Sequence, residues 1–296
     1  MQQNSYWEAD GNYTSMAVTM NCHGATLVGV LDKPSKPASV GMVIVVGGPQ
    51  YRIGSHRQFV ELSRQAAAAG VPTLRFDHRG IGDSAGDRRP FYAINDDIRA
   101  AIDCLCTQCH GVQKVVLWGL CDAATAILMY ANRDRRLGGV VLLNPWFESR
   151  RAQARSFLNY AWRRLRNPQF WRRLNRREVQ LGAALRELAA NAYRTFIEPD
   201  VSEAGSAEEK EVSAREDWLG RELARFHGAV LLILSGDDLT AETFRAMVRR
   251  SGTWRDAMSG SNVMQVQIPG ADHTFSRTEW ANRVHEETLD WLAKLR

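Results

Sequence analysis

Three residues of types that catalyse acyl transfer each follow a short apolar run in the sequence. Cys121, Asp238 and His273 lie in that chain order, and each comes within a few residues of a strand-like segment. Because the carboxyl ends of parallel strands gather at one edge of a sheet, we expect these side chains to lie close together. A nucleophile, an acid and a base in one place predict nucleophilic catalysis.

The sequence around Cys121 is typical of a tight turn between a strand and a helix. An apolar run at 115–118 leads into Gly119-Leu120-Cys121-Asp122-Ala123, and a run of small and apolar residues follows at once. Such a turn needs small residues beside its central side chain, because neighbouring backbone passes close to it. It also places that side chain at a helix N-terminus, which favours a thiolate over a thiol. From this turn alone, a nucleophile and a buried structural cysteine remain equal alternatives.

The order of the three residues and a second motif narrow the choice of fold. An Asp-x-Arg-Gly-x-Gly-x-Ser sequence at 77–84 follows another strand-like run. The order nucleophile, acid, histidine is that of the α/β-hydrolases and differs from the orders in chymotrypsin and subtilisin. With the Cys121 turn and the pair Asp272-His273, the sequence resembles an α/β-hydrolase. The resemblance implies the α/β class, with a mostly parallel central sheet, helices on both faces and a helical cap insertion.

A narrower resemblance extends from about residue 29 to 295. The chain is similar to the first type of exosortase A system-associated hydrolases in six segments, at 45–59, 74–86, 115–126, 142–147, 232–241 and 271–277. This resemblance implies a bacterial cytoplasmic hydrolase that is encoded beside machinery for exopolysaccharide production and protein sorting. It does not identify a substrate.

The resemblance also implies a role for each residue of the site. Cys121 would attack an ester or thioester carbonyl, and His273 would take the thiol proton and later protonate the leaving group. Asp238 would orient His273, with its neighbour Asp237 as the alternative acid. Asp272 is expected to be a structural carboxylate of the loop.

Two backbone N–H groups are expected to form an oxyanion hole. These are the N–H groups of Gly48 and of Asp122, since Pro49 has no N–H to donate. No metal or other cofactor is expected. Three further residues are expected to line the pocket: Gln50, His56 and Trp146.

A cysteine nucleophile leaves more than one function open. Its acyl adduct is a thioester, which passes its acyl group to water, an alcohol or an amine, so acyl transfer competes with hydrolysis as the predicted reaction. A non-catalytic, membrane-peripheral binding protein on a hydrolase scaffold is the third alternative. The expected substrate is a small-molecule or carrier-linked acyl compound.

The alternation of strand-like and helix-like runs predicts two parts of the chain. Residues 1–146 and 224–296 are expected to form the α/β-hydrolase core, beginning with a hairpin of strands at 17–20 and 26–31. Residues 147–223 are rich in Arg and Trp, contain no convincing strand and are expected to form a helical cap insertion.

The positive charge of the chain belongs to that insertion. The net charge is +5, yet residues 150–177 contain ten arginines and no acid, so the remainder carries about −5. Three interpretations stay open: a solvated face, a site for an anionic substrate, and peripheral contact with an anionic membrane through 150–177. No nucleic-acid-binding module is present in the sequence, so nucleic acid is not an expected partner.

The cysteines and the N-terminus bear on location and cofactors. Residues 106–110 match the C-x-x-C-H pattern of haem attachment, but that chemistry needs export and the N-terminus has no signal-peptide pattern. Buried cysteines at a helix end are the favoured interpretation. Five cysteines, an odd number, together with apolar runs too short to span a bilayer, indicate a cytoplasmic protein.

Overall fold

The computed structural model describes residues 6–9, 11–48, 50–147 and 203–296. Within them, nine strands form one sheet in the order β1-β2-β3-β5-β4-β6-β7-β8-β9. The first three strands pair antiparallel, as does β3 with β5, and every pairing from β5 to β9 is parallel. The strands are β1 (Tyr6–Ala9), β2 (Tyr13–Cys22), β3 (Ala25–Pro34), β4 (Val40–Val45), β5 (Thr73–Phe76), β6 (Lys114–Leu120), β7 (Leu137–Leu143), β8 (Ala229–Ser235) and β9 (Val263–Ile268).

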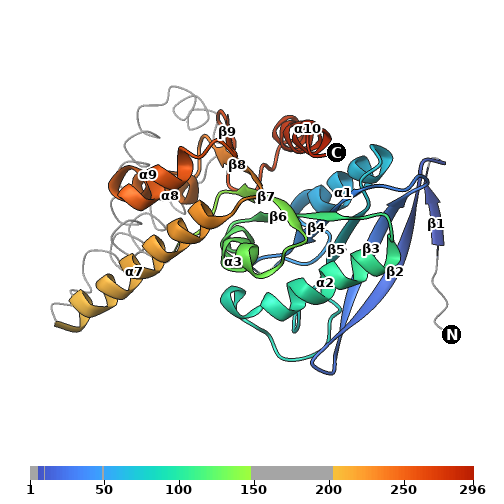
Figure 1. Cartoon of the computed structure of the whole chain (residues 1–296), viewed down its shortest axis with the longest axis horizontal. Coiled ribbons are helices and arrows are strands. Elements are labelled where there is room, and N and C mark those ends of the chain that lie inside the picture. Colours follow the sequence, from blue (N-terminus) through green and yellow to red (C-terminus); the bar gives the residue numbers. More distant parts are fainter. Residues whose placement is uncertain (1–5, 10, 49, 148–202) are drawn as a thin grey trace, which may run out of the picture.

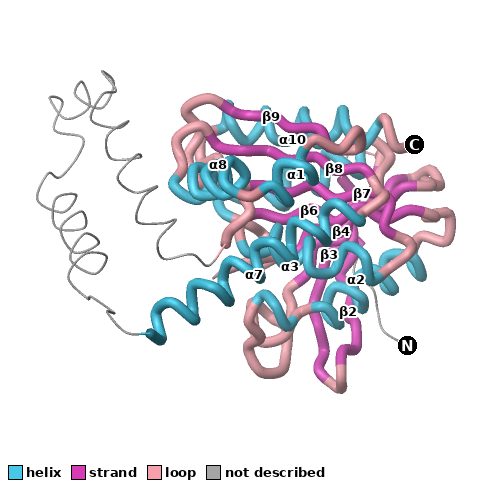
Figure 2. Tube along the Cα trace, turned by 60° about the vertical axis from the view of Figure 1, so that its left-hand side comes forward, coloured by secondary structure: helices cyan, strands magenta, loops and turns pink. Residues whose placement is uncertain are grey.

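Helices cover both faces of this sheet (Figures 1 and 2). Side chains of α1 (Gln58–Ala68) and α10 (Thr278–Ala293) share one buried apolar cluster with the strands. The helices that share the cluster on the other face are α2 (Asn95–Gln108), α3 (Asp122–Tyr130), α7 (Glu203–Arg225), α8 (Leu239–Arg250) and α9 (Gly252–Met258). Three short 3-10 helices complete the described elements: η1 (Ser55–Arg57), η2 (Phe91–Ala93) and η3 (Ala131–Arg133).

The central strands are buried from end to end, which explains their uninterrupted apolar sequence. All six residues of β4 are buried, and so are six of the seven in β6. A strand covered by helices on both faces has no solvent-facing row and needs no polar alternation. β9 at the sheet edge is different, because it alternates between exposed and partly buried residues.

The predicted opening hairpin is present and longer than expected. β2 and β3 pair along their whole length around a two-residue turn, His23 (φ 52°) and Gly24 (φ 82°). Two consecutive positive φ values match the twist that antiparallel strands need at a tight turn. The sequence analysis did not predict β1, a four-residue edge strand that pairs with β2.

The ends of the predicted cap insertion pack with the rest of the chain. Phe147 contacts Phe244 and Trp254, and Leu219 and Leu223 of α7 are buried in the same apolar cluster as α3 and α9. The last turns of α7 are therefore part of the hydrophobic core, although they precede the predicted boundary at 223. Residues 148–202, including the arginine-rich stretch, lie outside the described residues, so the cap stays a prediction.

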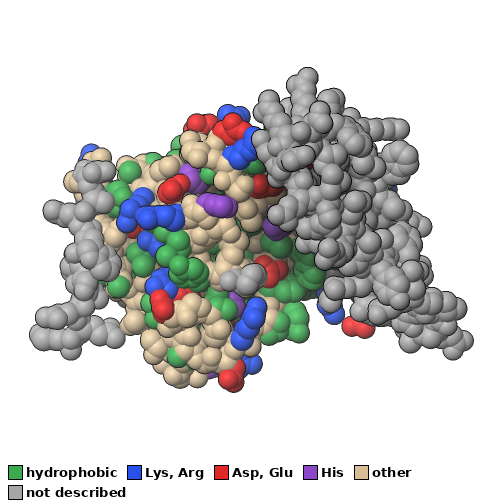
Figure 3. All heavy atoms as spheres, turned by 180° about the vertical axis from the view of Figure 1, so that it is seen from behind, with side chains coloured by type: hydrophobic (Ala, Val, Ile, Leu, Met, Phe, Trp, Pro, Cys, Tyr) green, Lys and Arg blue, Asp and Glu red, His purple; other side chains and the backbone are tan. Residues whose placement is uncertain are grey.

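Charges on the described surface are mixed in sign. On the face shown in Figure 3, basic and acidic side chains are interspersed over the described part of the surface. Among the described residues, no helix is long and apolar enough to cross a membrane.

Candidate active site

Cys121 lies at the turn between β6 and α3, in a backbone conformation that few side chains adopt. Its φ is 63° and its ψ is −122°, and α3 begins at the next residue. Two hydrogen bonds hold the turn: the Cys121 N–H donates to the carbonyl of Leu143 (2.8 Å), and the Trp146 N–H donates to the carbonyl of Cys121 (3.3 Å). A strained residue fixed by its neighbours is typical of a functional position.

Glycine 119 is needed for the turn to close. A Cβ at Gly119 would lie 2.7 Å from Cδ1 of Ile127 and 3.0 Å from the carbonyl carbon of Ala123. The first contact is closer than a side chain allows and the second is tighter than most, because α3 packs directly onto the end of β6. The small residues expected beside the nucleophile are therefore required by helix–strand packing.

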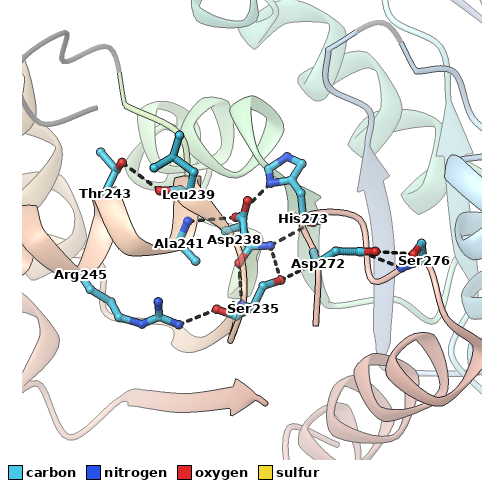
Figure 4. A network of polar contacts seen from close by, with 10 residues as sticks. Ser235, Asp238, Leu239, Ala241, Thr243, Arg245, Asp272, His273 and Ser276 are labelled. Carbon is cyan, nitrogen blue, oxygen red and sulfur yellow. Dashed lines mark hydrogen bonds and ion pairs between the residues drawn. The ribbon is translucent and has the colours of Figure 1, made fainter. Parts of the chain in front are cut away.

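The loops after β8 and β9 bring Asp238 and His273 together (Figure 4). Nδ1 of His273 lies 3.0 Å from Oδ2 of Asp238, and that oxygen also accepts a hydrogen bond from the Ala241 N–H (2.9 Å). Asp238 is the N-cap of α8, so the helix start fixes the carboxylate. Its side chain is 7% exposed, against 35% for His273.

The surroundings of His273 favour its protonated form. Burial lowers the pKa of the imidazole, but hydrogen bonds and charge from Asp238 and Cys121 outweigh it and raise the pKa to about 10. At neutral pH His273 is therefore a cation between a carboxylate and a thiol. Nucleophilic cysteines are commonly placed beside a protonated histidine.

The two alternative carboxylates are placed differently. Asp237 is exposed, and its backbone N–H donates to the carbonyl of Ala271 (2.9 Å). Asp272 accepts a hydrogen bond from the Ser276 N–H (2.9 Å) and another from the hydroxyl of that serine. Of these acids, Asp238 is the one that reaches His273, and Asp272 caps its own loop.

A buried polar network that the sequence analysis missed ties the acid and histidine loops together. Asn144, which follows β7, donates from Nδ2 to the hydroxyl of Ser235 (2.8 Å) and to the carbonyl of His273 (3.0 Å). Ser235 in turn donates its hydroxyl to the carbonyl of Asp272 (2.7 Å), as Figure 4 shows. Asn144 has a φ of 41° and is fully buried, so its conformation depends on these bonds. The only sequence signal was a polar residue at the end of an apolar strand.

The motif at 77–84 has a structural role. The carboxylate of Asp77 is fully buried and accepts a hydrogen bond from the backbone N–H of Arg52 (2.7 Å). It also forms an ion pair with the guanidinium of Arg52. The Ser84 hydroxyl donates to the Asp77 carbonyl (2.6 Å), and Arg79 pairs with Asp97 (2.7 Å). These contacts hold the loops beside the turn that carries Cys121.

A cavity of about 310 Å³ opens over Cys121. The described residues that line it are Gly47, Gly48, Gln50, Phe91, Leu120, Cys121, Asp122, Trp146 and His273. Gln50 and Trp146 thus line the cavity, as does His273. His56 is not among the described lining residues: it lies in η1, exposed and with a φ of 53°.

The expected oxyanion hole is partly filled by the chain itself. The Gly48 N–H donates to Oδ2 of Asp122 (2.9 Å), so in this arrangement it is not free to receive an oxyanion. Asp122 reaches it because position 47 is glycine: a Cβ there would lie 2.0 Å from Oδ1 of Asp122. Gly48 and Asp122 both line the cavity, and their role as an oxyanion hole stays a prediction. The direction of the Asp122 side chain could not be foreseen from the sequence.

The other cysteines differ from Cys121 in their surroundings. Burial raises the pKa of Cys22, Cys106 and Cys109, and it raises the pKa of Cys104 to about 11. These four side chains therefore stay protonated near neutral pH. Cys104, Cys106 and Cys109 lie in or just after α2, packed against the core.

Comparison with known protein families identifies the family of the chain. A sequence model of the alpha/beta hydrolase family matches residues 42–287. The chain belongs to the alpha/beta hydrolase family. This membership confirms two predictions: that the chain is a hydrolase, and that it has the α/β-hydrolase fold. No curated protein sequence matches the chain.

Solved structures share the fold at low sequence identity. An esterase from Pyrococcus furiosus is 14% identical, with 95% of this chain and 91% of that chain covered and a TM-score of 0.63. Est1E from Butyrivibrio proteoclasticus, solved with ferulic acid, is 16% identical over 94% and 99%, with a TM-score of 0.61. Proline iminopeptidase from Mycobacterium smegmatis is 16% identical over 94% and 98%, with a TM-score of 0.60. The names of these hydrolases describe different reactions, so the shared fold does not identify the reaction of this chain.

Proposed function

We propose that the chain hydrolyses ester or thioester bonds through an acyl-thioester on Cys121, with His273 and Asp238 as its partners. The observation that carries the proposal is the contact of Asp238 with His273, 3.0 Å, at the mouth of the cavity that Cys121 also lines. The thiolate sulfur attacks the carbonyl carbon, and the carbon–sulfur bond forms as the carbonyl π electrons move to oxygen. When the tetrahedral intermediate collapses, the bond to the leaving group breaks and His273 supplies its proton.

Deacylation reverses the role of the histidine. After the leaving group departs, neutral His273 takes a proton from a water molecule that attacks the thioester carbon. The carboxylic acid leaves and the thiolate–imidazolium pair is restored. Asp238 holds the ring in one orientation throughout, because its carboxylate is fixed by the start of α8.

Acyl transfer is the second candidate, and the cysteine itself favours it. A thioester is more reactive toward alcohols and amines than an oxygen ester, so the same intermediate can acylate an acceptor in place of water. Adding a primary alcohol or amine during turnover distinguishes the two reactions. Transfer predicts an acylated acceptor in excess over free acid, and hydrolysis predicts free acid alone.

The biological setting is proposed from the narrower sequence resemblance. Similarity to the exosortase A system-associated hydrolases supports a bacterial cytoplasmic enzyme that acts beside exopolysaccharide production and protein sorting. A carrier-linked acyl compound suits that setting. Binding of an anionic carrier or of a membrane through 150–177 is part of the same proposal and concerns residues outside the described part of the chain.

Kinetics of nucleophile variants test the proposed function. Turnover of neutral 4-nitrophenyl esters and acyl-thioesters is measured with the wild type and with Cys121→Ala, Cys121→Ser and His273→Gln. We expect no turnover by Cys121→Ala and at most weak turnover by Cys121→Ser, because a serine hydroxyl gives up its proton far less readily than a thiol. A Cys121→Ala variant as active as the wild type would contradict the proposal.

A further inference from the structure

One charged group in the cavity has no part in the proposed reaction. Asp122 follows Cys121 directly, is the first residue of α3 and lines the same cavity. Its backbone N–H is one of the expected oxyanion-hole donors, but its carboxylate is not needed for nucleophilic attack or proton transfer. A charge so close to the reacting atoms affects any charged substrate that approaches them.

The carboxylate of Asp122 is held in place and is not neutralised. Oδ2 accepts a hydrogen bond from the Gly48 N–H (2.9 Å), while Oδ1 is buried without a hydrogen-bond partner. In the described part of the chain, no lysine, arginine or histidine forms an ion pair with it. His78, whose imidazole is affected by the charge of Asp122, stays neutral because burial lowers the pKa of that side chain.

The remaining charges of the cavity do not offset Asp122. His273 is a cation, but the Asp238 carboxylate lies 3.0 Å from its ring and pairs with that charge. The other described lining residues are uncharged: Gly47, Gly48, Gln50, Phe91, Leu120 and Trp146. With the charge of His273 paired with Asp238, Asp122 is the unpaired charged side chain of the described wall.

We propose that Asp122 makes the site selective for neutral or cationic acyl groups by repelling those with a negative charge near the reacting carbonyl. The proposal rests on the proposed function in that Cys121 is the reacting atom. It concerns the acyl side of the substrate, so an anionic carrier attached as the leaving group is compatible with it. Unit charges about 6–8 Å apart at an effective dielectric constant of about 20 change a rate roughly tenfold or more.

Two small reagents that differ in charge test the proposal without requiring turnover. Iodoacetamide is neutral and iodoacetate is anionic, and with each the thiolate sulfur displaces iodide as the new carbon–sulfur bond forms. Rate constants at Cys121 are followed by intact mass, and peptide mapping assigns the modified residue. The other four thiols have raised pKa values, so they stay protonated and react slowly, since the thiolate is the nucleophile.

The decisive quantity is the ratio of the iodoacetate to the iodoacetamide rate constant. We expect Asp122→Asn to raise this ratio about tenfold at low salt and less at high salt. Asp122→Ser should do the same if the asparagine variant folds poorly. Asp290→Asn, which removes an exposed charge on α10, is the matched control and should leave the ratio unchanged. A ratio within twofold of the wild type in both Asp122 variants would overturn the proposal.

Ester kinetics extend the test to the proposed reaction. The mono-4-nitrophenyl ester of adipic acid is compared with the same compound capped as a methyl ester, which is neutral. The proposal predicts that the wild type prefers the capped ester, and that Asp122→Asn raises kcat/KM of the anionic ester relative to it about tenfold. Equal kcat/KM for both esters in the wild type would contradict the selectivity. If Cys121→Ala turns over either ester as the wild type does, the proposed function fails, while the alkylation ratio still decides the role of Asp122.

Discussion

A cysteine at the strand-to-helix turn changes what its histidine has to do. A serine nucleophile needs a neutral imidazole that accepts its proton during attack. The raised pKa of His273, about 10, means that the imidazole already carries a proton at neutral pH. In the proposed reaction its first chemical task is therefore to protonate the leaving group, after Cys121 has attacked as a thiolate.

Removing the charge of Asp238 should change both the rate and its pH dependence. We expect Asp238→Asn to lower kcat about 100-fold or more, because the ring loses its orienting carboxylate. The hydrogen bond to Asp238 raises the pKa of His273, so its loss lowers that pKa. The alkaline decline of kcat/KM, which follows deprotonation of His273, should then move to lower pH. Rate profiles from pH 5 to about pH 10 measure both effects.

Asp237→Asn is the matched control for that substitution. Asp237 is adjacent and exposed, so the same change of charge should leave kcat and the alkaline limb close to those of the wild type. A greater loss of kcat in Asp237→Asn than in Asp238→Asn would transfer the role of the acid to Asp237.

At the scale of elements, the site depends on how closely α3 packs against β6. Cys121 keeps its positive φ because Leu143 and Trp146 hold its backbone from the neighbouring strand and loop. The acid and the histidine are coupled in a similar way, through Asn144 and Ser235. Three strand ends therefore act as one support for the three side chains.

A methyl group at Gly119 should disturb that support measurably. We expect Gly119→Ala to lower the free energy of unfolding by about 1–3 kcal/mol and to reduce kcat, because its Cβ would overlap Ile127 and Ala123. Ile127→Val deletes the nearest overlapping atom, Cδ1, so the double variant should recover part of the loss. Urea unfolding and ester kinetics on the four members of this cycle provide the measurement. Fully additive effects would show that contact with Ile127 is not the cause of the loss in Gly119→Ala.

How far the sequence predicts these elements depends on the kind of signal each one leaves. The buried strands and the turn at Cys121 leave strong patterns, because apolar runs and small residues are required there. The edge strand β1 and the short helix α9 were missed, since four and seven residues give too little periodicity. Asn144 and the direction of the Asp122 side chain could not be predicted, because both depend on contacts between loops far apart in the chain.

At the scale of the whole molecule, charge is divided between two regions. The arginines at 150–177 carry ten positive charges, and the rest of the chain sums to about −5. The described wall of the cavity carries the Asp122 carboxylate next to Cys121. We expect any attraction of an anionic carrier to come from the arginine-rich segment and to depend on salt.

Two thioesters with the same neutral acyl group separate the carrier from the acyl chain. An acyl-coenzyme A carries phosphates, and the matching N-acetylcysteamine thioester is neutral. The kcat/KM of the coenzyme A ester should fall as ionic strength rises, while that of the neutral thioester should stay nearly constant. Arg163→Ala with Arg164→Ala should weaken the salt response. Equal salt responses for both thioesters would show that these arginines do not attract the carrier and instead contact solvent or a membrane.

The central claim is that Cys121 forms a covalent acyl adduct that His273 and Asp238 make productive. Intact mass spectrometry after rapid quenching of the wild type with a neutral acyl-thioester measures this adduct directly. The account predicts one added acyl group per chain, mapped to Cys121, absent in Cys121→Ala and longer-lived in His273→Gln once formed. Turnover of the thioester with an adduct on another residue, or with an undiminished adduct in Cys121→Ala, would contradict it.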